Sequence, residues 1–259
     1  VDTNLMQISA GIGQAEPRLA EASMVRGLEA IQALLADARP FSPACTVLVA
    51  TSAVRDAQNG AEFRERVRSA TGQTIRILTG NEEANLIGRG LTCDPALDGL
   101  NDFYVFDLGG GSLECLAFHG GQIQRVASLP LGCVRLMEKF VANPRRRFAA
   151  ATQTAVARHV RKVFARAVFP FYLPLDAVAV GTGGTFTTVR NVLAARSGRT
   201  LEQVDSIITV TQLREMLAWL GALPLAERQK IAGLPPARAD VFPTALATVI
   251  AIAEIGGLN

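Results

Sequence analysis

Three consecutive glycines between two carboxylates most constrain what this chain can fold into. They lie in the stretch 105–114, VFDLGGGSLE, which begins with an apolar run typical of a buried strand. Because glycine has no Cβ, successive backbone amides can turn inward and approach an anion closely. Asp107 and Glu114 add carboxylate oxygens, which hard cations such as Mg²⁺ prefer as ligands. The stretch therefore favours phosphate binding, and a tight hairpin without a ligand is the alternative.

The residues after these glycines indicate the class of loop. Strands are predicted over 113–118 and 122–128, so the glycines lie in a strand-to-strand turn. A Rossmann loop would instead open a helix. The Gly-Lys-Ser or Gly-Lys-Thr of a Walker loop occurs nowhere in the chain. The sequence therefore argues against both of these nucleotide-binding loops.

A second glycine-rich element follows a predicted strand over 177–180. It contains Gly181, Gly183 and Gly184 and leads into a helix predicted over 185–195. Helix N-termini attract anions through their unpaired amides and the helix dipole, and Thr185 adds a hydroxyl. An ordinary strand-to-helix turn is the alternative. Two such loops in one strand-rich chain together favour phosphate.

A pair of adjacent carboxylates forms the third element. Residues 74–84, TIRILTGNEEA, predict a strand over 74–78 and a helix beginning near Asn81, with Glu82 and Glu83 in its first turn. The helix dipole alone would favour carboxylates at this place. The sharper interpretation makes one of them a general base, because hydrolysis of a phosphoanhydride needs a group that orients and deprotonates water.

With these motifs in hand, the chain resembles the exopolyphosphatase and guanosine pentaphosphate phosphohydrolase family, a branch of the actin, Hsp70 and sugar kinase fold group. The resembling segments lie in family order at 50–57, 80–84, 107–114, 128–135, 181–185 and 238–240. The resemblance implies an α/β protein with the two-domain actin-like ATPase (ribonuclease H-like) fold and an interdomain cleft. It implies the short form, without an extra C-terminal domain.

The resemblance also assigns roles to the motif residues. Glu83 would be the catalytic carboxylate that activates water, with Glu82 as the neighbour most easily confused with it. Asp107 and Glu114 would hold a divalent metal, Mg²⁺ or Mn²⁺, and support catalysis. The implied substrate-binding residues are Arg55, Gly109, Gly110, Gly111, Ser112, Gly183, Gly184, Thr185 and Arg238.

Both arginines have a structural alternative. Arg55 could instead pair with Asp56 or Glu62, because guanidinium groups bind carboxylates as well as phosphates. Arg238 could form an ion pair with Asp240 or another carboxylate.

The activity implied is that of a phosphoanhydride hydrolase. It would release terminal orthophosphate from inorganic polyphosphate, or convert pppGpp to ppGpp as in the stringent response; the motifs do not separate the two substrates. A phosphotransferase of the same fold and a non-catalytic regulator that binds an alarmone or polyphosphate are the alternatives. Family members are commonly dimeric, which leaves a homodimer open.

Two α/β domains are expected, at 1–82 and 83–259, with Glu83 at the hinge. The family's first phosphate-loop strand has no counterpart before Val1, and its last strand and helix have none after Asn259. We therefore expect terminal segments of the family core to be missing from this sequence.

Composition and charge limit the kinds of molecule that this protein is expected to bind. The net charge of +3 permits an anionic substrate without predicting one. The basic residues 145–147 and those of a helix predicted around 158–166 could track polyphosphate or simply face solvent, and few aromatics accompany them, so no nucleic-acid partner is expected. Four scattered cysteines predict reduced, mostly buried thiols in a cytoplasmic protein. The longest apolar run, 245–253, is too short to span a membrane.

Overall fold

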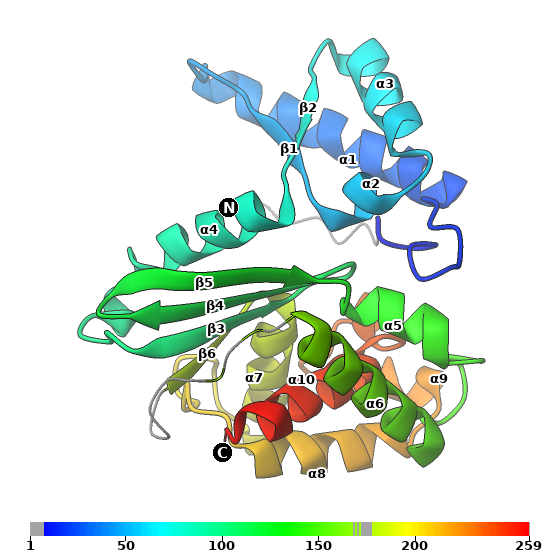
Figure 1. Cartoon of the computed structure of the whole chain (residues 1–259). Helices are drawn as coiled ribbons and strands as arrows, with labels where there is room; N and C mark the ends of the chain where they lie inside the picture. Colours follow the sequence, from blue (N-terminus) through cyan, green and yellow to red (C-terminus); the bar gives the residue numbers. More distant parts are fainter. Residues whose placement is uncertain (1–7, 168, 170, 172–177, 259) are drawn as a thin grey trace.

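The computed structural model describes residues 8–167, 169, 171 and 178–258. Residues 8–78 form what we call the small lobe, at the top of Figure 1. Its elements are α1 (Glu21–Ala38), a 3-10 turn (Arg39–Phe41), β1 (Leu48–Ala50), α2 (Ser52–Asp56), α3 (Gly60–Thr71) and β2 (Ile75–Ile77). The two strands pair in parallel, with Leu48 opposite Ile75. The strand expected at the start of the chain lies largely outside the described residues.

A four-stranded sheet organises the rest of the chain, which we call the large lobe (residues 79–258). The strand order is β5-β4-β3-β6. The strands are β3 (Phe103–Leu108), β4 (Leu113–His119), β5 (Gln122–Leu129) and β6 (Val178–Thr182). β3, β4 and β5 form an antiparallel meander, and β6 joins β3 in parallel. The predicted strand-to-strand turn at the three glycines and the predicted strand before the second glycine element are thus confirmed.

Helices cover both faces of this sheet (Figure 1). α4 (Gly80–Leu91) lies on one face, where it packs on β4 and β5. The helices gathered beneath the other face are α5 (Cys133–Phe140), α6 (Ala150–Ala167), α7 (Gly184–Ser197), α8 (Val210–Gly221), α9 (Leu225–Arg228) and α10 (Phe242–Gly256). Two further 3-10 turns are Pro95–Leu97 and Pro236–Arg238. The expected domain boundary between residues 82 and 83 falls inside α4, and its position stays a prediction.

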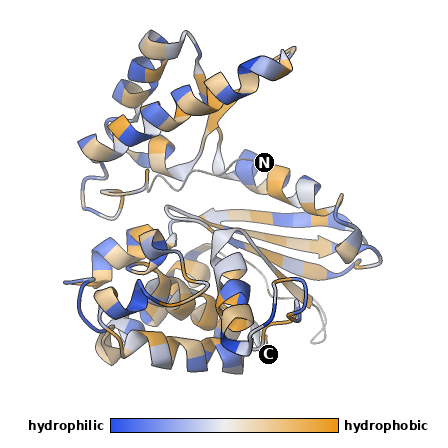
Figure 2. Cartoon of the chain, turned by 180° about the vertical axis from the view of Figure 1, so that it is seen from behind, coloured by the Kyte–Doolittle hydropathy of each residue, from blue (hydrophilic) through white to orange (hydrophobic). Residues whose placement is uncertain are grey.

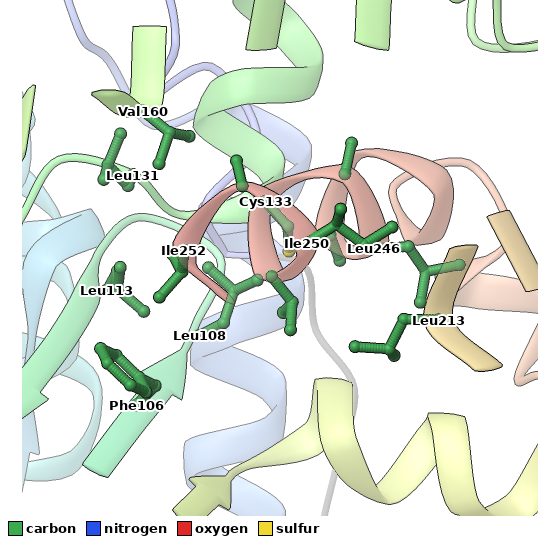
Figure 3. Close-up of a cluster of buried hydrophobic side chains, with 14 of the residues drawn as sticks. Phe106, Leu108, Leu113, Leu131, Cys133, Val160, Leu213, Leu246, Ile250 and Ile252 are labelled. Atoms are coloured by element: carbon green, nitrogen blue, oxygen red, sulfur yellow. The ribbon is translucent and has the colours of Figure 1, made fainter. Parts of the chain in front are cut away.

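The core of the large lobe lies between the sheet and α10. Every residue of α10 from Phe242 to Ala253 is buried, as expected of a helix that is apolar on all sides. Figure 3 shows Ile252 of this helix beside Leu108 and Leu113 from the sheet, with Ile250 farther along the helix near Leu246. The small lobe has its own cluster of buried side chains around Phe63 and Val67, and its helices mix polar and apolar residues in Figure 2. In the described residues, no helix is long and apolar enough to cross a membrane.

The face that each strand residue presents follows from alternation along the strand. Tyr104, Phe106 and Leu108 pack into the core on the α10 side, whereas Phe103 and Val105 pack with Ala84 of α4. Both faces of β3 are therefore covered, which explains its continuous apolar sequence. By the same alternation, Asp107 belongs to the α4 face at the carboxyl end of β3.

Candidate active site

Strand register brings the first two carboxylates together. Asp107 on β3 lies opposite Glu114 on β4, and Glu114 lies opposite Ser128 on β5. The hydroxyl of Ser128 donates to Oε1 of Glu114 over 2.7 Å. Glu114 shares its face with Leu116, which packs in the cluster under α4, so both carboxylates lie on the side of the sheet that α4 covers.

The start of α4 separates the roles of its two adjacent glutamates. Thr79 is the N-cap, and Glu82 closes a capping box by accepting from the Thr79 amide over 2.8 Å. That amide is the main reason why the pKa of the exposed Glu82 lies below its ordinary value, and its side chain also pairs with Arg76. Glu82 therefore stabilises the helix terminus at the surface.

Glu83 instead faces the small lobe. Nη1 of Arg55 donates to its Oε2 over 3.2 Å, and its side chain is 14% exposed. Thr51, the N-cap residue of α2, also donates a hydrogen bond from its side chain to Glu83. Burial raises the pKa of Glu83, opposed by Arg55. Of the two neighbouring carboxylates, Glu83 is the one that meets the other groups of the site.

The three buried carboxylates disturb one another. Burial, and then the charge of Glu83, raise the pKa of Asp107 to about 6. The same two causes, in the same order, raise the pKa of Glu114 to about 7. Electrostatic coupling to Glu83 at both positions means that α4 and the sheet present their carboxylates to one region. Its negative charge is incompletely compensated by protein groups.

This donor set fits a hard divalent cation. Asp107 and Glu114 offer only oxygens, and a cation between them would relieve the repulsion that raises both pKa values. Within the described part of the chain, no three His, Cys, Asp or Glu side chains converge with metal-binding geometry. An ion held by two carboxylates would take its other ligands from water and phosphate, as Mg²⁺ commonly does.

The first glycine loop is held through its carbonyl groups by α5. The amides of Cys133 and Val134 donate to the carbonyls of Gly109 and Gly110 over 2.9 Å and 3.0 Å. In the portion of the chain that is described, the amides of Gly110 and Gly111 donate to no other backbone group. Since α5 takes the carbonyls, the amide side of the loop remains for a ligand.

This loop also touches the small lobe closely. A Cβ at Gly110 would lie 2.6 Å from the hydroxyl of Ser9, and one at Gly111 would clash with the hydroxyl of Ser52. Only glycine permits this approach. Ser112 follows the glycines and is buried, and its side chain is one of the groups that lower the pKa of Glu114 against the effect of burial.

The second glycine loop lies against Asp107. Gly183 has φ of +83°, and a Cβ there would clash with Oδ1 of Asp107. A Cβ at Gly184, the first residue of α7, would clash with the guanidinium of Arg238. The N-terminus of α7, one carboxylate and one arginine therefore meet at this place, as the motif interpretation expected.

The hydroxyl of Thr185 has a different partner from the one expected. It donates to the carbonyl of Leu108 over 3.1 Å, and the residue is buried. This bond ties α7 to the end of β3. A contact between this hydroxyl and substrate is therefore not what the structure presents, whereas the Thr185 amide stays a candidate.

Arg55 has one of its two expected structural partners, and its contact with substrate stays a prediction. It pairs with Asp56 over 3.3 Å and with Glu83, and together with Asp56 it lines a pocket of about 470 Å³. Glu62 pairs with Arg66 instead. The remaining pocket residues are Thr79, Gly80, Asn81, Ser112, Ser128, Leu129 and Pro130.

For Arg238, no salt bridge to Asp240 or another carboxylate occurs within the described ranges.

Cys133 next to the first loop is not equipped as a nucleophile. Burial raises its pKa to about 11, so the thiol is protonated at neutral pH. All four cysteines are free; Cys115 and Cys133 are buried, but Cys45 and Cys93 are exposed, so the expectation of mostly buried thiols was only half right.

On the predicted basic helix, α6, Arg161 pairs with Glu254.

Sequence reasoning did not single out Thr51, Ser128 or Arg135, nor the two-arginine contact of Asp56. Ser128 and Arg135 are the first and last residues of the family-like segment 128–135, and Asp56 lies in the segment 50–57. The motifs therefore contained these residues without indicating their partners. Arg135 donates to the Gly111 carbonyl over 2.7 Å and pairs with Asp56 over 2.6 Å.

The two lobes form an α/β protein of the two-domain, actin-like fold class. The model of the Ppx/GppA phosphatase family matches residues 3–255, and the chain belongs to this family.

Solved structures show the same fold. An exopolyphosphatase-like protein superposes with a TM-score of 0.84 at 22% identity, covering 98% of this chain and 80% of the other. An exopolyphosphatase from Cytophaga hutchinsonii gives 0.79 at 22% identity, covering 96% and 78%. The Aquifex aeolicus member of the Ppx/GppA family gives 0.71 at 23% identity, covering 98% and 80%.

Proposed function

We propose that this protein releases terminal orthophosphate from inorganic polyphosphate or from pppGpp. The observation that carries the proposal is the electrostatic coupling of Glu83 to Asp107 and Glu114, with the second glycine loop against Asp107 and the first against serines of the small lobe. The exopolyphosphatase from Cytophaga hutchinsonii has this fold, which supports the polymer as one of the substrates. Both candidate substrates end in the same phosphoanhydride, so one site could accept either.

In the proposed reaction, Glu83 accepts a proton from water while the water oxygen bonds to the terminal phosphorus. The anhydride P–O bond breaks, and its electron pair stays on the shortened chain. Arg55 holds Glu83 in place and favours its ionised form. The amides of residues 110–111 and 183–185 would bind the oxygens of the transferred group, with Arg238 beside the second loop. Mg²⁺ or Mn²⁺ at Asp107 and Glu114 would neutralise phosphate charge.

The proposal is tested by phosphate release with Mg²⁺ on long polyphosphate, short polyphosphate and pppGpp. Glu83→Gln should lower kcat by roughly 100-fold or more, because the proton acceptor is lost, while substrate binding is kept. Glu82→Gln is the matched control, since glutamine also serves in a capping box and this side chain faces solvent. Equal activity of the two variants would remove Glu83 from the mechanism.

The same assay addresses the two alternatives. ADP added with polyphosphate would yield ATP if the protein were a phosphotransferase. Tight binding without turnover, across several divalent metals, would instead identify a regulator. We also propose that the protein forms a homodimer, which light scattering would test, and that it is located in the cytoplasm, which cell fractionation would test.

A further inference from the structure

Arg135 on α5 joins three parts of the molecule. Its Nε donates to the carbonyl of Gly111 in the first glycine loop over 2.7 Å. Its Nη1 donates to the carbonyl of Ile12 over 3.2 Å, and its Nη2 pairs with Oδ2 of Asp56 over 2.6 Å. The last two partners belong to the small lobe. One planar guanidinium thus fixes the loop relative to the opposite lobe, a geometry that a lysine ammonium cannot reproduce.

The contact with Asp56 continues to the proposed base. The other carboxylate oxygen of Asp56 accepts from Nε of Arg55, and Nη1 of Arg55 donates to Glu83. Arg55 is also tied to the carbonyl of Leu78 over 2.9 Å. Hydrogen bonds therefore run from the first glycine loop through Arg135, Asp56 and Arg55 to Glu83.

α5 is a firm base for this arrangement. One turn after Arg135, the carboxylate of Glu138 accepts from the amides of Gly11 and Gly13 over 2.6 Å and 2.7 Å. The first amides of the helix hold the carbonyls of Gly109 and Gly110. The side chain of Arg135 is only 14% exposed, so solvent competes little for its partners.

We infer that Arg135 is a positioning residue for the reaction, fixing the first glycine loop relative to the Asp56–Arg55–Glu83 chain. This inference rests on the proposed function. Catalysis by oriented groups is sensitive to small displacements, so losing this tie should slow the chemical step more than it weakens substrate binding. The expected signature is a lowered kcat with KM changed little.

The test compares Arg135→Ala and Arg135→Lys in steady-state phosphate release. The alanine variant should lose roughly 10- to 100-fold in kcat, and the lysine variant should recover part of it, because an ammonium can pair with Asp56 but cannot reach all three acceptors. Arg68→Ala, which removes an exposed pair with Glu65, is the matched control and should keep full activity. Thermal unfolding shows whether each variant is folded; should the alanine variant not fold, the lysine variant and Arg135→Gln decide.

A double-mutant cycle that combines Arg135→Ala with Asp56→Asn tests whether Arg135 acts through Asp56. If Arg135 acts through Asp56, the two losses in kcat will not add. Additive losses, or a rise in KM with kcat unchanged, would overturn the inference and leave the proposed function standing. Wild-type protein inactive on all three substrates would instead refute the proposed function, and the inference would fall with it.

Discussion

Glu82 and Glu83 are neighbours of the same residue type whose surroundings move their pKa values in opposite directions. Glu82 is exposed, and the Thr79 amide stabilises its charge. Glu83 is largely buried, where desolvation outweighs the nearby Arg55. A carboxylate with a raised pKa is a better proton acceptor once ionised, which is what a general base requires. One residue of difference along the helix thus separates a helix cap from a candidate catalytic group.

Gly183 offers a prediction at the same scale. Gly183→Ala places a side chain at φ +83° and ψ −177°, a region essentially restricted to glycine and costing about 1–3 kcal/mol, and also drives its Cβ into Asp107. Gly198→Ala is the matched control, because Gly198 also has positive φ but no atom lies within 4 Å of its Cβ position. Denaturant unfolding should show a loss of about 1–2 kcal/mol for Gly198→Ala, which is in the left-handed region, and a larger loss for Gly183→Ala. Phosphate release should fall sharply only for Gly183→Ala; equal activities would mean that Asp107 tolerates displacement.

At the scale of elements, α9 is joined to the loop before α6 by a buried guanidinium. Arg228 is 1% exposed and donates to the carbonyls of Pro144 and Arg146 over 2.7 Å and 3.2 Å. The amide of Leu225 donates to the carbonyl of Arg145 nearby. Burial lowers the pKa of Arg228, which fits a purely structural role for this cation.

Arg228→Met should therefore destabilise the fold. The replacement fills a similar volume but removes both part-buried hydrogen bonds to these carbonyls, at a cost of about 1–3 kcal/mol in the free energy of unfolding. Lys230→Met removes only a surface pair with Glu227 and should stay within about 0.5 kcal/mol of wild type. Urea titrations followed by circular dichroism measure both. A change in Arg228→Met as small as that of the control would show that water satisfies these carbonyls.

Elements with a strong local signal could be predicted from the sequence, and side-chain partners could not. Apolar runs on either side of Gly109–Gly111 indicate the two strands, and the glycine-rich turn at Gly183 indicates the start of the helix that follows. The five-residue α2 is too short to show a helical period. Thr79 and Glu82 carry the capping-box spacing, a signal that could have separated Glu82 from Glu83.

The features of the candidate site that the sequence could not predict are contacts between residues far apart in the chain. Asp56 and Arg135 are 79 residues apart and meet only because the lobes pack together. The hydroxyl of Thr185 has its partner 77 residues away, so its position in a glycine motif could not reveal where it points. Motifs identified which residues gather, and only the folded chain shows what each one touches.

At the scale of the whole molecule, the site is built from groups that repel one another. Asp107 and Glu114 belong to the large sheet, Glu83 to the helix above it, and Arg55 to the small lobe. Without bound cations, folding must bring these carboxylates together at a cost that depends on their ionisation.

The stability of the metal-free protein should therefore fall as the pH rises. The folded pKa values of Asp107 and Glu114, about 6 and about 7, lie above the ordinary 3.8 and 4.5. Their stabilising contribution is fully present below the ordinary values and is lost as the pH rises through the folded ones. The free energy of unfolding of wild type minus that of Asp107→Asn/Glu114→Gln should thus decrease from about pH 4 to about pH 8. A difference that is independent of pH would contradict this expectation; added Mg²⁺ should raise the Tm of wild type only.

The ion pair between Arg55 and Glu83 is one of those that cross from lobe to lobe. Arg55 stands on α2, whereas Glu83 stands on a helix that packs against the large sheet. Moving the lobes apart would take the guanidinium away from the carboxylate and let water reach Glu83. Because burial is the largest cause of its raised pKa, the pKa would fall and Glu83 would release a proton to the buffer. Opening and closing of the molecule would thereby become a titration, visible as heat that scales with the ionisation enthalpy of the buffer.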